Sequence, residues 1–331
     1  MKSRIRFNEK YNQLSLKEEK LVTKASVLVK KFVELSPKIS KTNFRTRDAH
    51  AKSYADIHGI LKINDVADEN FKNIFSLKEY TAVIRISNAT MQIAEGKDSL
   101  PAYGFSIKLL KFSEGKEFNL PLVNFPLFTN SVENFLKLFI AINSYKISNV
   151  KMGFLSKLKL PNVMLKTAFV LPEAFKNSIP RNAFRTFFNR KKNPLGFSYH
   201  SVGCYRMGDF IVKFMLEPPR EKALSKKLGN RTQKEAINEI LTKNKLVYSL
   251  KMQYCRDEEM VNDLSRMWPK KKFTEIGKLI IEPNSFLNSE KTEVLSFNPF
   301  ENLDILKPVG RMQKTREKIY KVSVDTRRIS I

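Results

Sequence analysis

The sequence predicts an α+β protein built on an antiparallel sheet, because runs of alternating residues recur along the chain between helical stretches. Within 246–254, apolar residues at every second position alternate with Ser249, Lys251 and Gln253, as in a strand with one buried face. Further runs with strand character lie at 58–63, 80–87, 104–112, 209–217 and 277–282. Helical stretches lie at 131–143, 171–177, 232–244 and 256–267. Many strands with helices inserted between them favour one antiparallel sheet, which we expect to close as a barrel.

The first 44 residues differ from the rest, and we expect them to form a helical arm (1–44) outside the main domain (45–331). This segment is polar, and Ser15-Leu-Lys-Glu opens like a capped helix. We expect the helix to end before Pro37. The arm should pack on the outside of the domain or fray.

The composition allows a large core and gives no sign of export. The 331 residues are 42% hydrophobic and include 25 phenylalanines. The longest apolar stretch, 135–142, is interrupted by Lys137 and is too short to span a bilayer, and the N-terminus lacks the apolar segment of a secretory signal. Cys204 and Cys255 are the only cysteines, and we expect both to be reduced and buried. These features predict a cytoplasmic protein.

The charge is strongly positive. Lysine and arginine number 60 against 33 acidic residues, giving a formal charge of +27. Such a field attracts anions of every kind, including nucleic acid, lipid headgroups and fatty-acid carboxylates. The basic residues are dispersed, and no nucleic-acid-binding signature accompanies them. We therefore expect a solvated basic surface first, and loose attraction to an anionic membrane or lipid substrate second.

The C-terminal segment 316–328 carries the clearest functional pattern. On a helix, Arg316 would lie about 40° from Tyr320 and Arg327 about 20° from it, so both arginines would share a stripe with the phenol. A neighbouring guanidinium favours the phenolate form of a tyrosine, which is the form that binds a ferric ion. The alternative interpretation is an amphipathic basic helix with Tyr320 packed in the core.

A second polar pattern lies near the N-terminus. In the strand-like run 80–88, Arg85 and Ser87 share one face with Thr81 and Val83. Arginine and serine on the same face of an otherwise apolar strand suggest a polar site. His50, one of only three histidines, follows an arginine-rich loop at 43–47.

These segments belong to a series of six motifs through which the chain resembles the haem-dependent catalase superfamily, in particular its shorter bacterial catalase-related members. The resemblance spans about 45–328. In order, the motifs are Arg-x-x-His-Ala-Lys at 47–52, Val-Ile-Arg-Ile-Ser at 83–87, Gly-Phe-Ser-Ile-Lys at 104–108, Leu-Val-Asn-Phe-Pro-Leu-Phe at 122–128, Tyr-x-Ser-x-x-x-Tyr-Arg-x-Gly at 199–208, and Arg-x-x-x-Tyr with a further arginine at 316–327.

The resemblance implies a fold and a cofactor. The expected fold is an eight-stranded antiparallel barrel wrapped by helices, with haem b (iron protoporphyrin IX) buried between the barrel and the C-terminal helix. Residues 45–331 would then be the haem domain. Tyr320 would be the iron ligand, with Arg316 as its charge partner. Arg47, Arg85 and Arg327 match the arginines that clamp the haem propionates.

The resemblance also implies the opposite, distal side of the haem. His50 matches the distal histidine, which acts as a general acid and base. Ser87 matches the serine that orients it. The distal asparagine would be Asn124, although strict register from Pro126 places a valine where large catalases have it. Phe128 could face the haem, with ordinary core packing as the alternative.

The function expected from these residues is that of a haem enzyme acting on hydrogen peroxide or on organic (fatty-acid) hydroperoxides, as a catalase-like peroxidase or a hydroperoxide lyase or isomerase. A second hypothesis is a non-enzymatic basic protein of the same fold that binds nucleic acid or anionic lipid through its charge. Binding of nucleic acid or anionic lipid that weakens steeply with added salt would distinguish the second hypothesis from the first.

Overall fold

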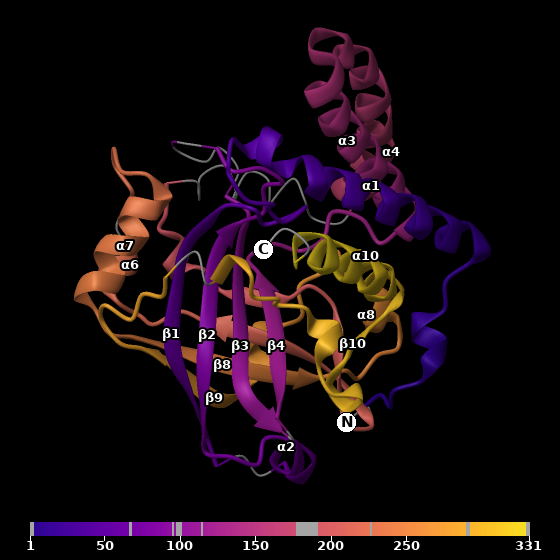
Figure 1. Cartoon of the computed structure of the whole chain (residues 1–331). Coiled ribbons are helices and arrows are strands. Elements are labelled where there is room, and N and C mark those ends of the chain that lie inside the picture. Colours follow the sequence, from indigo (N-terminus) through magenta and orange to yellow (C-terminus); the bar gives the residue numbers. More distant parts are fainter. Residues whose placement is uncertain are drawn as a thin grey trace.

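A closed antiparallel barrel forms the centre of the molecule, as expected (Figure 1). The computed structural model describes residues 3–65, 68–94, 96, 101–113, 115–176, 191–225, 227–288 and 292–328. Within these residues, eight strands close a ring in the order β1-β2-β3-β4-β5-β7-β8-β9, because β9 pairs with β1 and β8 pairs with β7. Strands β6 and β10 continue the sheet from β7 outside the ring. The strands are β1 (Ser53–Ile63), β2 (Glu79–Asn88), β3 (Tyr103–Ser113), β4 (Lys116–Val123), β5 (Tyr199–Ser201), β6 (Cys204–Met207), β7 (Phe210–Glu217), β8 (Leu246–Tyr254), β9 (Thr274–Ile281) and β10 (Pro308–Val309).

Aromatic side chains fill the interior of the barrel. Phe105 of β3 is fully buried, and its ring centroid lies 5.3 Å from those of Tyr199 and Tyr248. On β2, Ile84 and Ile86 belong to the same core. Because successive side chains on a strand point to opposite faces, Arg85 lies on the outer face of the sheet. A functional cavity near Arg85 must therefore lie outside the barrel.

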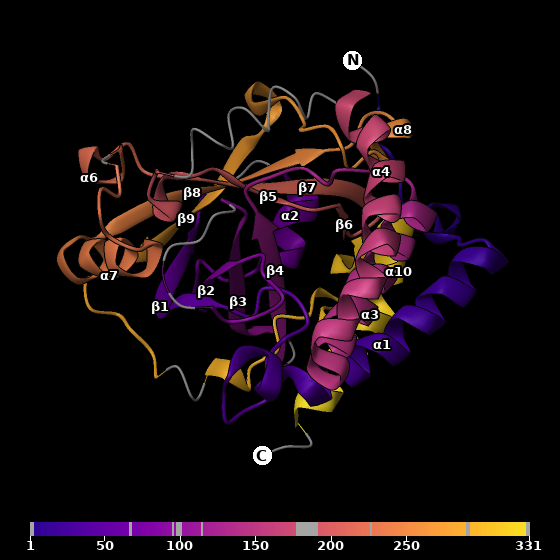
Figure 2. The same ribbon diagram turned by 90° about the horizontal axis from the view of Figure 1, so that it is seen from above.

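A layer of helices covers this outer face (Figure 2). Helices α1 (Leu16–Ser40), α3 (Val132–Met152) and α10 (Arg311–Arg328) share a second apolar core, separate from the barrel interior. Contacts between α1 and both other helices hold the layer together. The members of this core include Val22, Ala25, Val29 and Val33 of α1, Leu136 and Ile140 of α3, and Met312 and Ile319 of α10.

The N-terminal helix packs against the molecule along much of its length, and it is longer than expected. The capping box predicted at Ser15 is present. Our prediction that the helix ends before Pro37 was wrong, since α1 continues to Ser40. Proline cannot donate to the carbonyl of Val33, four residues earlier. The hydroxyl of Ser36 donates to that carbonyl instead, at 2.7 Å.

The other elements agree with the sequence to different degrees. Strand β4 was not expected, because Pro121 in its interior weakens the strand signal. The helix expected at 256–267 shrinks to α8 (Glu259–Asn262), since the side chain of Asn130 accepts the backbone N–H groups of the residues that follow. The remaining α-helices are α2 (Glu69–Ile74), α4 (Leu160–Lys176), α6 (Lys222–Ser225) and α7 (Gln233–Lys243). Position 177, the end of the helix expected at 171–177, lies outside the described residues.

No helix in the described part of the chain is long and apolar enough to cross a membrane. Both cysteines are free and buried, as expected.

The packing of α1 predicts a contrast between two identical substitutions. Val29 is fully buried against the other helices, whereas Val27 is 52% exposed. We expect Val29→Ala to lower the free energy of unfolding by about 2 kcal/mol, through lost burial and a residual cavity. Val27→Ala should leave it within about 0.5 kcal/mol. Urea denaturation measures both, and equal effects would mean that α1 does not pack as described.

Candidate functional site

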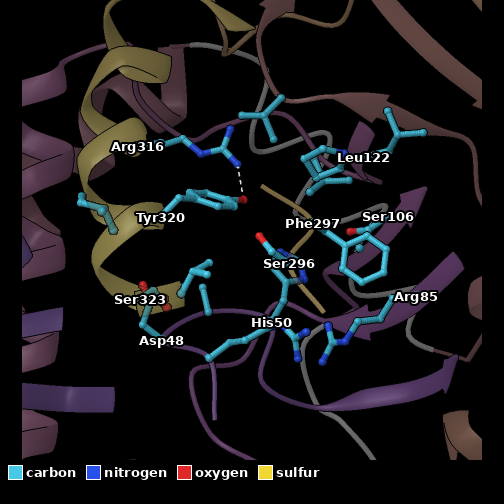
Figure 3. A pocket seen from close by; sticks show the side chains of 18 of the residues that line it. Asp48, His50, Arg85, Ser106, Leu122, Ser296, Phe297, Arg316, Tyr320 and Ser323 are labelled. Atoms are coloured by element: carbon cyan, nitrogen blue, oxygen red, sulfur yellow. Dashed lines mark hydrogen bonds between the residues drawn. The ribbon is translucent and has the colours of Figure 1, made fainter. Parts of the chain in front are cut away.

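One cavity lies between the outer face of the barrel and helix α10 (Figure 3). Strands β2, β3 and β4 contribute one wall, and α3 and α10 contribute the other. Its empty space is about 1360 Å³, including solvent at its mouth. The apolar part of the lining includes Leu122, Val123, Phe125, Leu127, Phe135 and Phe139. Largely apolar walls on which several polar side chains converge are typical of a site for a small molecule or cofactor.

Tyr320 reaches the cavity from α10. Arg316, one helical turn earlier, donates a hydrogen bond of 2.7 Å from Nη2 to the phenol oxygen. The side chain of Gln313 accepts a bond from the same guanidinium at 2.5 Å and so holds it in place. The ring of Phe300 meets the tyrosine ring edge to face, with centroids 6.1 Å apart. The i,i+4 spacing predicted the arginine–tyrosine pair, and a charge-assisted bond of this kind stabilises negative charge on the phenol oxygen.

His50 reaches the same cavity from the segment before β1. Its backbone has a φ of +54°, a left-handed conformation that few residues adopt. The ring nitrogen Nδ1 lies 3.1 Å from the hydroxyl of Ser87 on β2. Figure 3 shows the His50 ring and the Tyr320 hydroxyl directed into one space from different elements. The two segments that the sequence singled out therefore meet.

Gly104 is a site residue that we did not single out by itself. It belongs to β3 and lies behind the imidazole. A Cβ atom built there would lie 2.7 Å from both Cε1 and Nδ1 of His50 and 3.0 Å from the hydroxyl of Ser87. A Cβ atom this close would push the imidazole out of its position, so glycine leaves the room that the imidazole needs there. A glycine inside a strand is a signal of close approach, and it could have indicated this role.

The imidazole of His50 is neutral at ordinary pH. Burial lowers its pKa from 6.5 to about 3, and the positive charges of Arg85, Arg316 and Arg47 act in the same direction. A neutral imidazole has one nitrogen that donates and one that accepts. With Nδ1 engaged by Ser87, the remaining nitrogen can exchange a proton with a molecule in the cavity.

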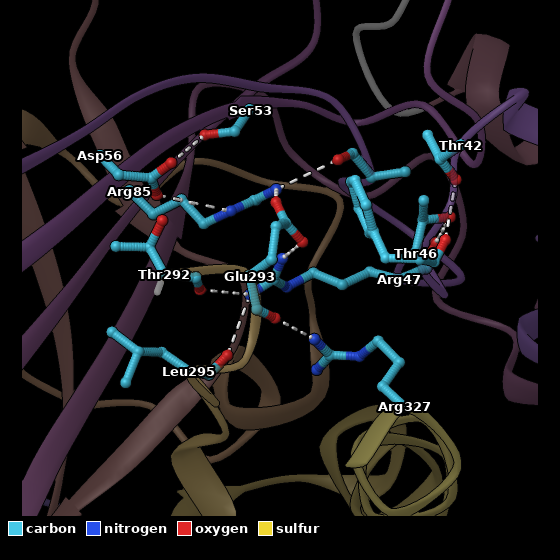
Figure 4. Close-up of polar contacts among 12 residues, drawn as sticks. Thr42, Thr46, Arg47, Ser53, Asp56, Arg85, Thr292, Glu293, Leu295 and Arg327 are labelled. Carbon is cyan, nitrogen blue, oxygen red and sulfur yellow. Dashed lines mark hydrogen bonds and ion pairs between the residues drawn. The ribbon is translucent and has the colours of Figure 1, made fainter. Parts of the chain in front are cut away.

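Three arginines converge at one side of the cavity, around Glu293 (Figure 4). Arg47 donates to the Glu293 carboxylate at 2.5 Å, and Nη2 of Arg85 lies 3.5 Å from its other oxygen. Arg327 donates to the backbone carbonyl of Glu293 at 2.9 Å. The sequence analysis singled out each of these arginines separately, and in the structure all three contact Glu293.

The charges in this cluster do not balance. Burial alone would raise the pKa of Glu293, but the three guanidiniums hold it below its ordinary value. Asp56 adds a second carboxylate 3.8 Å from Nε of Arg85. Asp48 interacts with Arg327 and Arg316 and adds a third carboxylate. The site as a whole therefore has four guanidiniums, those of Arg47, Arg85, Arg316 and Arg327, against three carboxylates, and this excess of positive charge can bind an anionic group of a ligand. Nothing in the sequence around Glu293 indicated its role, because its partners lie more than 30 residues away.

Three expected site residues do not line the cavity: Asn124, Phe128 and Ser87, the last of which contributes only through its hydrogen bond with His50. The side chain of Asn124 accepts from the backbone of Tyr103 at 2.8 Å and donates to the carbonyl of Pro101 at 3.0 Å, so it ties two chain segments together. Val123 lines the cavity in its place. Phe128 packs behind the wall, with its ring 5.9 Å from that of Phe135, which does line the cavity.

Carboxylates, histidines and cysteines do not form a metal site here. Among the described residues, no group of three or more such side chains could hold a metal ion. Asp48 lies in the cavity wall but accepts a hydrogen bond of 2.6 Å from Ser323. Burial, the largest influence, raises its pKa.

Comparison with known proteins gives the fold. No protein-family model and no curated protein sequence matches the chain. Among solved structures, it is similar to a fungal catalase, with a TM-score of 0.60, 17% identity and coverage of 87% of this chain and 60% of that one. Catalase A from Saccharomyces cerevisiae is similar with a TM-score of 0.60 and 16% identity, over 99% of this chain and 67% of that one. A bacterial catalase is similar with a TM-score of 0.55 and 14% identity, over 87% of this chain and 58% of that one.

The molecule therefore has the catalase fold, as the motifs predicted. The chain spans about three fifths of the length of the fungal and bacterial catalases that it resembles. At this level of identity, the likeness establishes the architecture, and the activity has to be argued from the cavity.

The neutral state of His50 predicts a loss of stability in acid. An unfolded histidine takes up a proton near pH 6.5, whereas His50 resists protonation until about pH 3. Its contribution is therefore complete above pH 6.5 and is lost as the pH falls towards 3. Between pH 7 and pH 5 the free energy of unfolding should fall by about 2 kcal/mol through this residue.

Urea denaturation of the wild type and of His50→Asn at both pH values isolates this effect. His200, whose pKa burial also lowers to about 3, is present in both proteins and cancels. The variant should lose about 2 kcal/mol less than the wild type on acidification. An identical pH dependence in the two proteins would contradict the assignment of a buried, neutral His50.

Proposed function

We propose that the protein is a haem b enzyme that processes peroxides, with Tyr320 as the iron ligand and His50 as the general acid and base. One observation carries this proposal: a tyrosine and a histidine, each held by its own partner, face one apolar cavity. Arg316 holds the phenol and Ser87 holds the imidazole. The catalase fold of the chain supports the same reading.

The residues present fit the cofactor. Haem combines a flat apolar body with two carboxylates, and tyrosine is among the axial ligands that its iron accepts. The apolar walls suit the body. Arg47, Arg85 and Arg327 would hold the propionates, since their guanidiniums converge at one side of the cavity. Arg316 would stabilise the phenolate that binds iron. When bound, haem would supply a redox-active ferric centre for cleavage of the peroxide O–O bond.

His50 would move the proton. Because it is neutral at pH 7, it could accept a proton from one oxygen of the peroxide and return it to the other, leaving oxygen. Both transfers require the ring to keep one orientation. The bond to Ser87 and the close approach of Gly104 restrict that orientation.

The cavity favours an organic hydroperoxide over hydrogen peroxide. Val123 replaces an amide at the position where the family's asparagine was expected, and Phe135 and Phe139 of α3 extend the apolar wall. Apolar walls gain free energy from a hydrocarbon chain, at about 25 cal/mol for each Å² removed from water. Hydrogen peroxide would gain nothing from these contacts. A fatty-acid hydroperoxide is the substrate class that this lining suits.

The first test concerns the iron ligand. The purified protein supplied with haem should show a Soret absorption band, and Tyr320→Phe should abolish or shift it, because phenylalanine has no oxygen to bind iron. Tyr145→Phe, on α3 and away from the cavity, is the matched control and should keep the wild-type spectrum. Failure of the wild type to take up haem, or an unchanged spectrum in Tyr320→Phe, would exclude this role.

The second test concerns proton transfer. We expect His50→Ala to lower kcat by about 10²- to 10⁴-fold, the usual contribution of a general acid and base. His58→Ala, a change at an exposed histidine of β1, should have no effect. Consumption of a fatty-acid hydroperoxide should exceed oxygen evolution from hydrogen peroxide. Equal rates in the His50 variant and the wild type would refute the assignment.

A further inference from the structure

Helices α3 and α4, joined by the 3₁₀ helix η2 (Gly153–Lys159), form a hairpin that projects away from the rest of the molecule (Figure 1). The first half of α3 packs in the core that it shares with α1 and α10. Beyond it, the contacts of η2 and α4 are mainly with α3 and with each other. The tip of the hairpin, residues 151–170, therefore presents a large surface to solvent.

This tip is apolar where a soluble surface would be polar. Phe154 and Leu158 of η2 are 77% and 78% exposed, and Met164 of α4 is 66% exposed. At about 100° per residue, the exposed apolar residues of α4 fall within one half of its circumference, opposite the buried Val170. Exposed apolar residues gathered on one continuous surface, unlike scattered ones, mark an interaction site. The members of this patch are Met152, Phe154, Leu155, Leu158, Leu160, Met164, Leu165 and Phe169.

The charge of the tip has one sign. Residues 151–170 contain four lysines and no aspartate or glutamate. The ammonium group of Lys157 lies 4.4 Å from the ring centroid of Phe154, and that of Lys166 lies 5.8 Å from the ring of Phe169. Lysines directly beside exposed aromatic rings would meet phosphate groups while the rings enter the acyl region. Helices that lie in the interface of an anionic membrane have this composition.

We propose that the tip of the α3–α4 hairpin docks the protein on the surface of an anionic lipid bilayer. The lysines and the formal charge of +27 attract such a surface, and the apolar patch supplies the burial that holds the protein there. A second copy of the chain fits this surface less well. Lysine is depleted in protein interfaces, and two such basic surfaces would repel each other.

Docking of this kind would also bring the cavity close to its proposed substrate. Helix α3 carries Phe135 and Phe139 in the cavity wall and leads directly to the tip. Met152 lies thirteen positions after Phe139 on the same helix, which corresponds to about 20 Å. This link to a lipid hydroperoxide rests on the proposed function, whereas the docking itself depends only on the surface of the hairpin.

Sedimentation with vesicles tests the proposal. We expect the protein, loaded with haem, to bind vesicles that contain phosphatidylserine, and to bind phosphatidylcholine vesicles far more weakly. Added salt should reduce the binding. The double variant Phe154→Gln, Leu158→Gln should weaken binding about a hundredfold, because two large side chains lose their burial in lipid. Lys157→Gln with Lys166→Gln should remove most of the preference for phosphatidylserine.

A matched control variant distinguishes specific docking through this surface from nonspecific adsorption of exposed apolar residues. Leu16 and Leu77 are also exposed, at 79% and 51%, but lie on other elements, so Leu16→Gln with Leu77→Gln should bind like the wild type. No binding by the wild type, or equal binding by the tip variant, would overturn the proposal. The proposal would also be overturned if the wild type formed a dimer in solution and the tip variant were monomeric, because the patch would then be a contact between two copies of the chain. The tip variant should keep the wild-type absorption spectrum, so the docking can fail independently of the haem assignment.

Discussion

The burial of one face of α10 determines the geometry of the whole site. Met312 and Ile319 pack into the core shared with α1 and α3, and this packing fixes the rotation of the helix about its axis. Tyr320 follows Ile319 directly, so its side chain turns from that core towards the cavity. Arg327, about 10 Å further along the helix, reaches the arginine cluster. A different rotation of α10 would separate the phenol from the imidazole of His50.

A second constraint is the cost of burying three guanidiniums. Removing a charge from water costs several kcal/mol unless partners compensate for it. Glu293 and the backbone carbonyls of the same segment supply that compensation for Arg47 and Arg327. The segment around Glu293 thus holds the cluster together without neutralising it. In the proposed haem complex, the propionates would share these arginines with Glu293.

Local patterns in the sequence predicted part of the fold and part of the site. The strand 246–254 was predicted to the residue, because its alternation is strict. The shared face of Arg85 and Ser87 and the pairing of Arg316 with Tyr320 follow from strand and helix periodicity, which a sequence displays directly. The six motifs in family order predicted the eight-stranded barrel wrapped by helices, whereas periodicity alone does not determine how the strands and helices are arranged.

Features that depend on distant partners were not predictable in this way. Glu293 gains its role from arginines on three other segments, and Gly104 gains its role from the imidazole that it faces. The side chain of Asn124 turns away from the cavity because backbone groups of Tyr103 and Pro101 offer it hydrogen bonds. Nor does the sequence show that the apolar residues of 151–170 are exposed, since the same residues could have formed a core.

The filled barrel separates the part of the molecule that provides stability from the part that selects a ligand. Rings such as Phe105 and Tyr248 occupy the interior of the barrel, whereas α3, which contributes Phe135 and Phe139 to the cavity wall, lies outside the closed ring of strands. Substitutions of the cavity-facing side chains of α3 can therefore change the cavity and leave the interior of the barrel intact. A family built on this plan can acquire new chemistry by exchanging one helix face.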